Sequence, residues 1–416
     1  MIILVSDLHL ADTCRPTIRL DVFLRDLQRR ISFAAECGVK SIQLVLLGDI
    51  FELLKSEEWL EKEVRPWEET SPKHQQTVDA ILEKIIDNNS AFFDGLNLLA
   101  TDSQASVRIL YVPGNHDRPL TTSMGDAARA RLKKIVPVVE WEDYFDRPFI
   151  DPEHRLIARH GHEWDPLNRY NGKTAAIGDA IVIDLLLNLA RLFRKKLDLT
   201  ESDPELVFLH ELDNVRPQNG KVLAQWLSRG IDNLVKTQPS ARTVFEEVCK
   251  ELLDNFRALK STSQKKGVDF EHFTHAERLL RIFRSVSSSL GGVLETAELV
   301  PSLGDNNDTL CEYAVNALSY YQKIDCKYVV SGHTHKPVII PLNSSECRNM
   351  GTPIYLNTGT WRRVNCVSST IQRFGRRRCF ATWDEECVVS IFTEQEQRTL
   401  RLPAYEFSRL SRGSNG

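Results

Sequence analysis

The chain has 416 residues, of which 42% are hydrophobic and 26% are charged, and its formal net charge is −4. This composition excludes wholesale disorder, a collagen-like repeat and a small scaffold held together by disulfides. A protein that coats nucleic acid through its bulk charge is more basic, so only a local basic patch remains for that role. The length allows either several domains or one core with a large insertion.

The nine cysteines are scattered along the chain, and no two of them form a C-x-x-C pair. We therefore expect reduced thiols in a cytoplasmic protein rather than a zinc knuckle or a disulfide framework. The apolar N-terminus is interrupted at Asp7, which is too early for the core of a signal peptide. The longest apolar stretch, 180–193, is too short and too polar to cross a bilayer.

The first part of the chain alternates between strand-like and helix-like patterns. Short apolar runs predict buried strands, and apolar residues at helical spacing predict the helices between them. In chain order, the expected elements are a strand at Ile2–Ser6, a helix over Leu20–Ile31 that stops at Gly38, a strand at Ile42–Leu47, a helix over His74–Leu99, a strand at Val107–Val112 and a strand at Leu156–Ala158. Strands that alternate with helices indicate a layered α/β domain.

The pattern changes after residue 165. Residues 166–325 have helical periodicity and no clear strand signal, so we expect a helical cap inserted into the α/β core. Strand signals then return at Tyr328–Ser331, Ile354–Asn357, Arg378–Thr382, Val388–Thr393 and Thr399–Leu402. The expected organisation is a discontinuous core formed by residues 1–165 and 326–404, with a flexible tail at 405–416.

Polar residues cluster immediately after the expected strands of the core. The five clusters are Asp7-Leu8-His9, Gly48-Asp49, Gly114-Asn115-His116-Asp117, His160-Gly161-His162 and Gly332-His333-Thr334-His335. Because ligands bind outside the carboxyl ends of the strands in α/β sheets, we expect these loops to converge on one site.

Several side chains of these loops are of the types that bind metal ions. The candidate ligands are Asp7, His9, Asp49, Asn115, His160, His333 and His335. Carboxylate, amide and imidazole groups without a thiol suit Mn, Fe, Zn or Ni better than a soft thiolate site would. The set is too large for one tetrahedral zinc ion and suits two metals that share a carboxylate. Two metals about 3.5–4 Å apart activate water and clamp both oxygens of an in-line displacement at phosphorus.

In this order, the five clusters resemble the motifs of the calcineurin-like metallophosphoesterases. The second motif extends to Glu52, as Gly48-Asp49-x-x-Glu52. The resemblance covers about 1–165 and 326–395 and leaves the helical segment outside. It implies an α/β fold, namely a four-layer α-β-β-α sandwich with a large helical insertion. It also implies that metal-activated water hydrolyses a phosphoester, phosphodiester or pyrophosphate bond.

The resemblance further implies how the ligands divide between two divalent ions. The implied assignment places one metal at Asp7, His9 and His335, the other at Asn115, His160 and His333, and Asp49 as the bridge between them. Mn²⁺ is the expected ion, with Fe, Zn and Ni as alternatives.

Residues beside the ligands receive roles from the same resemblance. His116 would protonate the leaving oxygen or stabilise its charge. Glu52 stands where family members often have aspartate, and it would orient His116. His162, Asp117 and Arg118 are candidates for contact with the substrate or for support of the ligands.

The substrate is expected to be phosphorylated, but several classes stay open. Segment Asp179–Leu197 is strongly apolar with a basic end, and we interpret it as a buried helix of the insertion. The alternative is a helix that contacts lipid at a membrane surface, or a partner protein. The position of the insertion, between the fourth and fifth motifs, is similar to the helical insert of the UDP-diacylglucosamine hydrolases of lipid A synthesis, which covers acyl chains.

Two further hypotheses come from other features of the chain. Arg373 and the run Arg376–Arg378, with Arg362 and Arg363 upstream beside Trp361, form a basic cluster that, in a nuclease, would hold a nucleic-acid backbone. A solvated hairpin turn is the favoured interpretation of this cluster, given the net charge. In the non-enzymatic alternative, the helical insertion docks on a partner and the protein is an interaction scaffold. The oligomeric state is left open.

Overall fold

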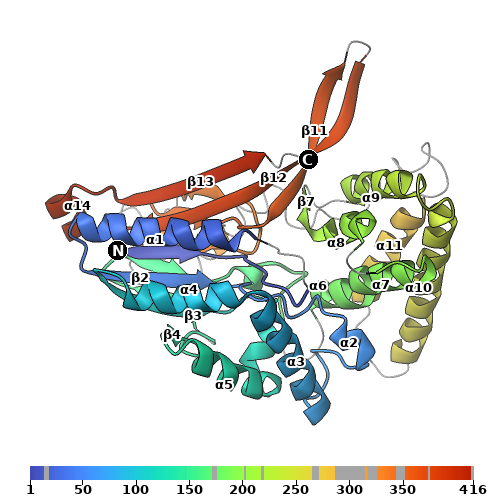
Figure 1. Cartoon of the computed structure of the whole chain (residues 1–416), viewed down its shortest axis with the longest axis horizontal. Coiled ribbons are helices and arrows are strands. Elements are labelled where there is room, and N and C mark those ends of the chain that lie inside the picture. Colours follow the sequence, from blue (N-terminus) through green and yellow to red (C-terminus); the bar gives the residue numbers. More distant parts are fainter. Residues whose placement is uncertain are drawn as a thin grey trace.

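The computed structural model describes most of the chain. The described residues are 1–13, 18–145, 147–170, 176–200, 203–216, 220–264, 271–285, 314–316, 326–342, 352–372 and 375–413. They form an α/β structure with two β-sheets and a group of helices beside them (Figure 1). The expected α/β class is confirmed.

The first sheet combines a parallel half with an antiparallel half. Its strands, in spatial order, are β4 (Val139–Glu140), β3 (Ser106–Val112), β2 (Ser41–Leu47), β1 (Ile2–Val5), β12 (Gly375–Ile391), β11 (Arg363–Gln372) and β7 (Val215–Arg216), and β13 (Tyr405–Gly413) pairs with β12. Strands β1 to β4 run parallel, whereas β12 runs antiparallel to β1. The parallel half therefore delivers the ends of β1, β2 and β3 to the same edge.

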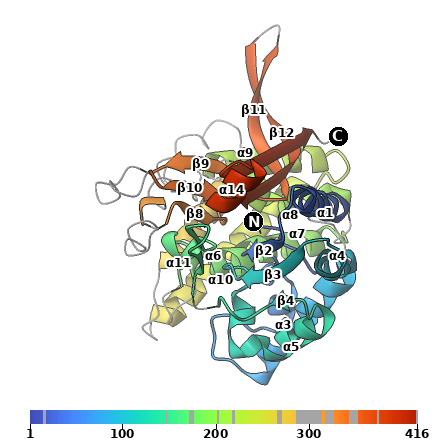
Figure 2. The same ribbon diagram turned by 90° about the vertical axis from the view of Figure 1, so that its left-hand side faces the viewer.

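The second sheet has a parallel centre with antiparallel edges. Its order is β5 (Phe149–Asp151), β6 (Leu156–Ala158), β8 (Tyr328–Ser331), β10 (Ile354–Asn357) and β9 (Val338–Pro341). Strand β6 precedes the insertion and β8 follows it, and the two pair in parallel. Figure 2 shows β8, β9 and β10 as a group set apart from β2, β3 and β4.

The two sheets pack face to face, and helices cover the outer face of the first. Along β1, Ile2 and Leu4 enter the core between the sheets, and Ile3 and Val5 enter the core under the helices. This alternation follows from the two-residue period of a strand that is buried on both faces. The covering helices are α1 (Leu20–Glu36), α2 (Glu58–Glu61), α3 (Pro72–Asn88), α4 (Ser90–Thr101) and α5 (Asp126–Ile135). On the outer face of the second sheet, Ala314 of the helical residues 314–316 packs in one cluster with Val329 and Tyr355.

Helix His74–Leu99, expected as one element, is two helices that meet at Asn89. The Asn89 side chain donates to the carbonyl oxygens of Ile85 (2.8 Å) and Ala11 (3.2 Å). Asparagine competes with helical hydrogen bonding in this way and favours helix ends over helix interiors. The two helices therefore turn at the Asn89-Ser90 step.

Two expectations at the C-terminal end of the chain are wrong. Residues 399–400 belong to helix α14 (Glu394–Leu400), not to a strand, because Thr393 and Glu396 form a capping box that starts the helix. The expected flexible tail is strand β13 over 405–413, which pairs with β12 along its length. Tyr405 and Phe407 pack against the core between the sheets, and this burial holds the strand.

The insertion has its own hydrophobic core. Its described elements are α6 (Ile177–Ala180), the π-helical stretch Ile181–Leu187, α7 (Asn188–Lys196), the short turns Pro204–Leu206 and Leu212–Asn214, α8 (Val207–His210), α9 (Gly220–Leu234), α10 (Ala241–Gln264) and α11 (Glu271–Ser285). It is not wholly helical, because β7 pairs in parallel with β11 of the first sheet. This pairing and several ion pairs join the insertion to the α/β core.

Segment 181–196 is apolar because it packs against both halves of the molecule. Leu185, Leu189 and Phe193 are buried in the core of the insertion. Ile183 and Leu187 belong to the core under the helices of the first sheet. Its expected burial is thus confirmed. No helix within the described ranges has both the length and the apolar character needed to cross a bilayer.

Candidate metal centre

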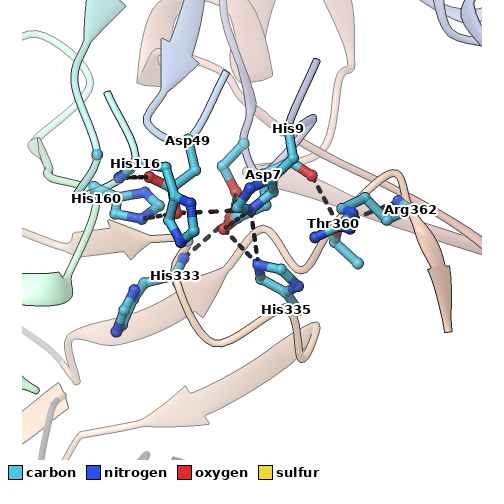
Figure 3. A network of polar contacts seen from close by, with 12 residues as sticks. Asp7, His9, Asp49, His116, His160, His333, His335, Thr360 and Arg362 are labelled. Carbon is cyan, nitrogen blue, oxygen red and sulfur yellow. Dashed lines mark hydrogen bonds and ion pairs between the residues drawn. The ribbon is translucent and has the colours of Figure 1, made fainter. Parts of the chain in front are cut away.

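Each of the five polar clusters lies where a parallel strand ends. Asp7 and His9 follow β1, and Asp49 follows β2. The other clusters follow β3, β6 and β8 in the same way. Beyond the strands, the first two loops stay paired, because the amides of Asp7 and His9 donate to the carbonyl oxygens of Gly48 (3.0 Å) and Asp49 (2.9 Å). The expected convergence of the clusters is observed (Figure 3).

The first donor group consists of Asp7, His9, Asp49 and His335, whose ligand atoms all lie within 4.8 Å of one another. His335 Nε2 is 3.1 Å from Asp7 Oδ1 and also 3.1 Å from His9 Nε2. His9 Nε2 is 3.6 Å from Asp49 Oδ2. Two carboxylates and two imidazoles that point at one position can hold a divalent cation.

The second donor group shares Asp49 with the first and adds His160 and His333. His160 Nε2 lies 3.1 Å from Asp49 Oδ2. Asn115 Oδ1 is buried without a hydrogen-bond partner in the described structure, and Asp7 Oδ1 and His160 Nε2 have close contacts with other candidate ligands but no well-directed hydrogen bond. Buried polar atoms without partners are costly, so their convergence fits cations as the missing partners. The residues present can therefore hold metal ions, and the two donor groups have Asp49 in common.

Three of these histidines have one ring nitrogen held by a neighbour. Nδ1 of His9 contacts Glu52 Oε2 at 2.8 Å, and Nδ1 of His160 contacts the Leu47 carbonyl oxygen at 3.0 Å. Nε2 of His333 contacts Asp165 Oδ2 at 2.9 Å. A metal-binding histidine donates its second ring N–H in this manner, which sets the tautomer and leaves the other nitrogen for the metal.

The backbone at the candidate ligands is strained. Asp7, His9, Asp49, His333 and His335 have φ values of 55°, 47°, 50°, 69° and 55°. Residues with a Cβ rarely adopt this left-handed region, and each instance costs on the order of 1–3 kcal/mol. Such strain gathers at functional sites, where the surrounding fold holds the residues in place. Its concentration on five candidate ligands supports a functional role.

Two glycines allow the loops to approach one another closely. A Cβ at Gly114 would lie 2.1 Å from Asp49 Oδ1, and a Cβ at Gly332 would lie 2.4 Å from Asp7 Oδ2. Backbone amides one or two residues after these glycines contact the two carboxylates instead. The His116 and His333 amides donate to Asp49 Oδ1 (2.9 Å) and Asp7 Oδ2 (3.0 Å), which aims the two carboxylates.

The site combines carboxylates that stay ionised with imidazoles of different charge. Burial alone would raise the pKa of Asp7, but His335 and His160 hold that pKa well below its usual range. Burial would lower the pKa of His160, but Asp49 and Asp7 raise it to about 10. At His335, the effect of burial exceeds the opposing effect of the Asp7 charge and lowers the pKa of His335 to about 3. This ring is therefore neutral and able to bind a cation.

Glu52 joins His9 to His116. Its Oε1 lies 2.6 Å from His116 Nδ1, and its Oε2 accepts from His9. These three residues also form a compact donor group, but both carboxylate oxygens of Glu52 are already used by the two Nδ1 atoms. Burial disfavours the imidazolium of His116, yet the charges of Glu52 and Asp49 raise its pKa to about 9. The contact between Glu52 and His116 that the resemblance implied is therefore present.

The three residues with open roles lie in different surroundings. His162 has its ring centroid 5.6 Å from that of His160 and lies beside the second donor group. Burial lowers the pKa of His162 to about 3. Asp117 accepts from the amides of Phe51 and Gly114 (both 2.9 Å) and holds two motif loops together. Arg118 points to the insertion, where it pairs with Asp179.

Sequence reasoning missed several residues of the site. Asp165 carries no motif signal, because it follows the His160 cluster in an irregular segment and reaches His333 only in the folded chain. Lys55, Asp213 and Arg362 line the same cavity as His9, Asp49 and His335. A lone lysine or aspartate in a sequence does not reveal such a position, whereas Arg362 was expected only as part of the arginine cluster.

The ligands open into a cavity of about 160 Å³ between the α/β core and the insertion. On the side of the insertion, apolar side chains line it, among them Ile181, Leu212 and Phe283. On the side of the core are the donor groups and His116. The cavity thus has donor groups that can hold metal ions on one side and an apolar wall on the other.

Comparison with known proteins leaves the family of this chain open, because no family model and no curated protein matches it.

Proposed function

We propose that this protein is a binuclear metal-dependent phosphoesterase with the sandwich fold of the calcineurin-like metallophosphoesterases. It would hydrolyse a phosphoester, phosphodiester or pyrophosphate bond. The observation that carries the proposal is the pair of donor groups that share Asp49. Two cations bridged by one carboxylate suit an in-line displacement at phosphorus, in which both the attacking and the leaving oxygen need charge compensation.

Metal ions are what the donor set is suited to hold, and Mn²⁺ fits its mixture of oxygen and imidazole ligands, as do Fe, Zn and Ni. When bound, the two ions supply an activated water and neutralise charge on the phosphoryl oxygens. Asp7, His9 and His335 would hold one ion, and Asn115, His160 and His333 the other. The strained loops orient these side chains before a substrate arrives.

His116 is the candidate for proton transfer to the leaving oxygen. Its Nδ1 is engaged by Glu52, so Nε2 is the atom left to face the substrate. The pKa of about 9 keeps the ring protonated at neutral pH, as a general acid requires. Glu52 acts through His116 by fixing the tautomer and the orientation of its ring.

The other hypotheses gain less support. The arginines Arg376–Arg378 belong to the β11–β12 hairpin, which extends away from the body in Figures 1 and 2, and Arg373 lies outside the described residues. Their strand partners start at Ile371, eight residues along β11 from Arg363 or roughly 25 Å at the rise of a strand. They are therefore remote from the candidate metal centre. Of the described arginines of the cluster, Arg362 alone lines the cavity beside the donor groups, so an extended basic surface for a nucleic-acid backbone gains no support. Hydrolysis of a pyrophosphate bond, as in the UDP-diacylglucosamine hydrolases, remains one of the proposed activities.

Turnover of a generic substrate by matched aspartate variants tests this proposal. The purified chain is assayed with bis-p-nitrophenyl phosphate and p-nitrophenyl phosphate in Mn²⁺, and Asp49→Asn is compared with Asp94→Asn on the exposed face of α4. We expect metal-dependent turnover in the wild type and in Asp94→Asn, and a loss of roughly a thousandfold or more in Asp49→Asn. If the wild type has no turnover with Mn, Fe, Zn or Ni, the enzyme proposal is wrong and the interaction scaffold gains.

A further inference from the structure

Two cationic side chains, Lys55 and Arg362, line the cavity beside the donor groups (hereafter the metal cavity). Both belong to loops that are hydrogen-bonded to the motifs. The Lys55 amide donates to Glu52 Oε1 at 3.1 Å. The Arg362 amide donates to Thr360 Oγ1 at 3.2 Å, and that hydroxyl donates to the Asp7 carbonyl oxygen at 2.8 Å. Figure 3 shows Thr360 and Arg362 beside the cluster that contains Asp7. Hydrogen bonds therefore fix the backbones of Lys55 and Arg362 relative to the candidate metal centre.

One carboxylate of the insertion holds both cations. Lys55 Nζ lies 3.0 Å from Asp213 Oδ1, and Arg362 Nη1 lies 2.9 Å from Asp213 Oδ2. Asp213 stays ionised. Burial alone would raise its pKa, but Arg362 and Lys55 hold that pKa well below its usual range. Glu52 and Glu211 also act on Arg362 electrostatically, so the case for an anion rests on the hydrogen-bond donors of the two cations rather than on net charge.

Arg362 is buried and incompletely bonded. Its side chain is 5% exposed, and its Nε has no hydrogen-bond partner among the described residues. Leaving a buried charged donor without a partner is costly unless a ligand completes its hydrogen bonds. The guanidinium group forms paired hydrogen bonds with phosphate and carboxylate oxygens. The Nε–H of Arg362, which has no acceptor among the described residues, thus points to an anion in the cavity.

We propose that Lys55 and Arg362 bind a second anionic group of the substrate, a phosphate or a carboxylate next to the phosphate that is hydrolysed. This inference rests on the proposed phosphoesterase function, since it deepens the same site. Asp213 is the positioning residue: it sets the spacing of the two cations and lowers their net attraction for the anion. The insertion thereby contributes to substrate selection through Asp213.

Three phosphonates that resist hydrolysis separate one anionic group from two. Methylphosphonate carries one anionic group, methylenediphosphonate carries a second phosphonate, and phosphonoacetate carries a carboxylate in its place. Each is titrated calorimetrically into the Mn²⁺-loaded protein at one fixed free Mn²⁺ concentration. In the wild type, we expect at least one of the two-group probes to bind roughly tenfold or more tightly than methylphosphonate, because a charged hydrogen-bond pair contributes about that much. The stronger of the two identifies the second group as phosphate or carboxylate.

Variants show whether Lys55 and Arg362 are responsible. Lys55→Met and Arg362→Met should each weaken the two-group probe about tenfold and change methylphosphonate binding much less. Lys55 is the more exposed of the two, so Lys55→Met carries the test if Arg362→Met does not fold. Arg363→Met, a neighbour whose side chain is 45% exposed and pairs with Asp384, is the matched control and should bind like the wild type.

Asp213→Asn distinguishes anion binding from a structural role. Removing the competing carboxylate should tighten the two-group probe, whereas a purely structural Asp213 would weaken all three probes alike. Equal binding of all three probes to a wild type that hydrolyses the aryl esters would overturn the second anion position and leave the phosphoesterase standing. A wild type without turnover that still prefers the two-group probe would overturn the proposed function and leave the anion position standing.

Discussion

His333 is a candidate ligand whose backbone and ring are both held in place by neighbouring groups. Its backbone is left-handed, its amide donates to Asp7, and its Nε2 is held by Asp165. The strain, on the order of 1–3 kcal/mol, is sustained because Gly332 lets the loop approach Asp7 closely. Its ring is thus fixed by groups that are not themselves candidate ligands of the same ion.

Asp165→Asn tests the support of His333. The amide can keep a hydrogen bond but loses the negative charge that makes the imidazole a better ligand. We expect binding at the second donor group to weaken roughly 10–100-fold, as measured by calorimetric titration of Mn²⁺ into the apo protein. Asp94→Asn should titrate like the wild type, and unchanged Mn²⁺ affinity in Asp165→Asn would remove Asp165 from the site.

His116→Ala separates metal binding from proton transfer. His116 contacts Glu52 and lines the cavity but is absent from both metal donor groups that share Asp49. We expect two Mn²⁺ ions per chain to remain and kcat to fall about 10²–10⁴-fold, because general acid catalysis contributes that much. The loss should be smaller for a p-nitrophenyl ester, whose leaving group is a weak base. Loss of metal together with activity would instead make His116 a ligand.

Among the elements, the apolar segment 181–196 explains how the insertion is attached. It faces the insertion with Leu185, Leu189 and Phe193, and it faces the α/β core with Ile183 and Leu187. The charges along it pair with the core rather than with solvent alone: Asp184 contacts Arg65 at 2.8 Å, and Arg194 contacts Glu57 at 2.8 Å. A helix that serves two cores needs apolar residues around most of its circumference.

Phe193→Ala tests the burial of this segment. Phe193 is fully buried and meets Phe245 edge to face, with ring centroids 5.6 Å apart. Removing the ring should lower the free energy of unfolding by about 3–5 kcal/mol in chemical denaturation. Phe33→Ala on α1, where the side chain is 61% exposed, should cost far less. Equal small losses in both variants would favour the lipid- or partner-facing interpretation of the segment.

At the scale of the whole molecule, the metal cavity lies at the junction of two units. The core contributes the donor groups, and the insertion contributes the opposite wall and Asp213. The junction is held by the Arg118–Asp179 pair, by the contacts of Asp213 and by the pairing of β7 with β11. The insertion therefore shapes the cavity, whereas the candidate ligands come from the core.

Metal removal should affect the whole molecule. Without cations, the carboxylates and imidazoles of the two donor groups lose their shared partner. Ions at a free concentration of 100 times their Kd would add about 2.7 kcal/mol per site to the free energy of unfolding. We expect dialysis against EDTA to abolish turnover and to lower the thermal midpoint by several degrees, with both restored by Mn²⁺. Metal analysis of the active protein should find two ions per chain. One ion per chain in fully active protein would contradict the two-metal mechanism.

How much the sequence predicts depends on the range of the interactions involved. Strands such as Ile42–Leu47 and Leu156–Ala158 follow from local apolar runs, and the structure has them within a residue. The strand β13 was missed because residues 405–413 show no strand pattern of their own. They form a strand because they pair with β12. The break at Asn89 depends on a side-chain bond to Ala11, which no local pattern shows.

The sequence by itself determined which loops carry the candidate ligands, because donor residues directly follow apolar strands and parallel strands end at one edge. Only the tertiary structure decided that Asp49 is shared by two donor groups, that Asp165 holds His333, and that Asp213 of the insertion reaches Lys55 and Arg362. These relations join residues far apart in the chain, and they arise from packing between sheets and insertion rather than from local propensity. A motif records which residues are present, and the fold sets the distances between them.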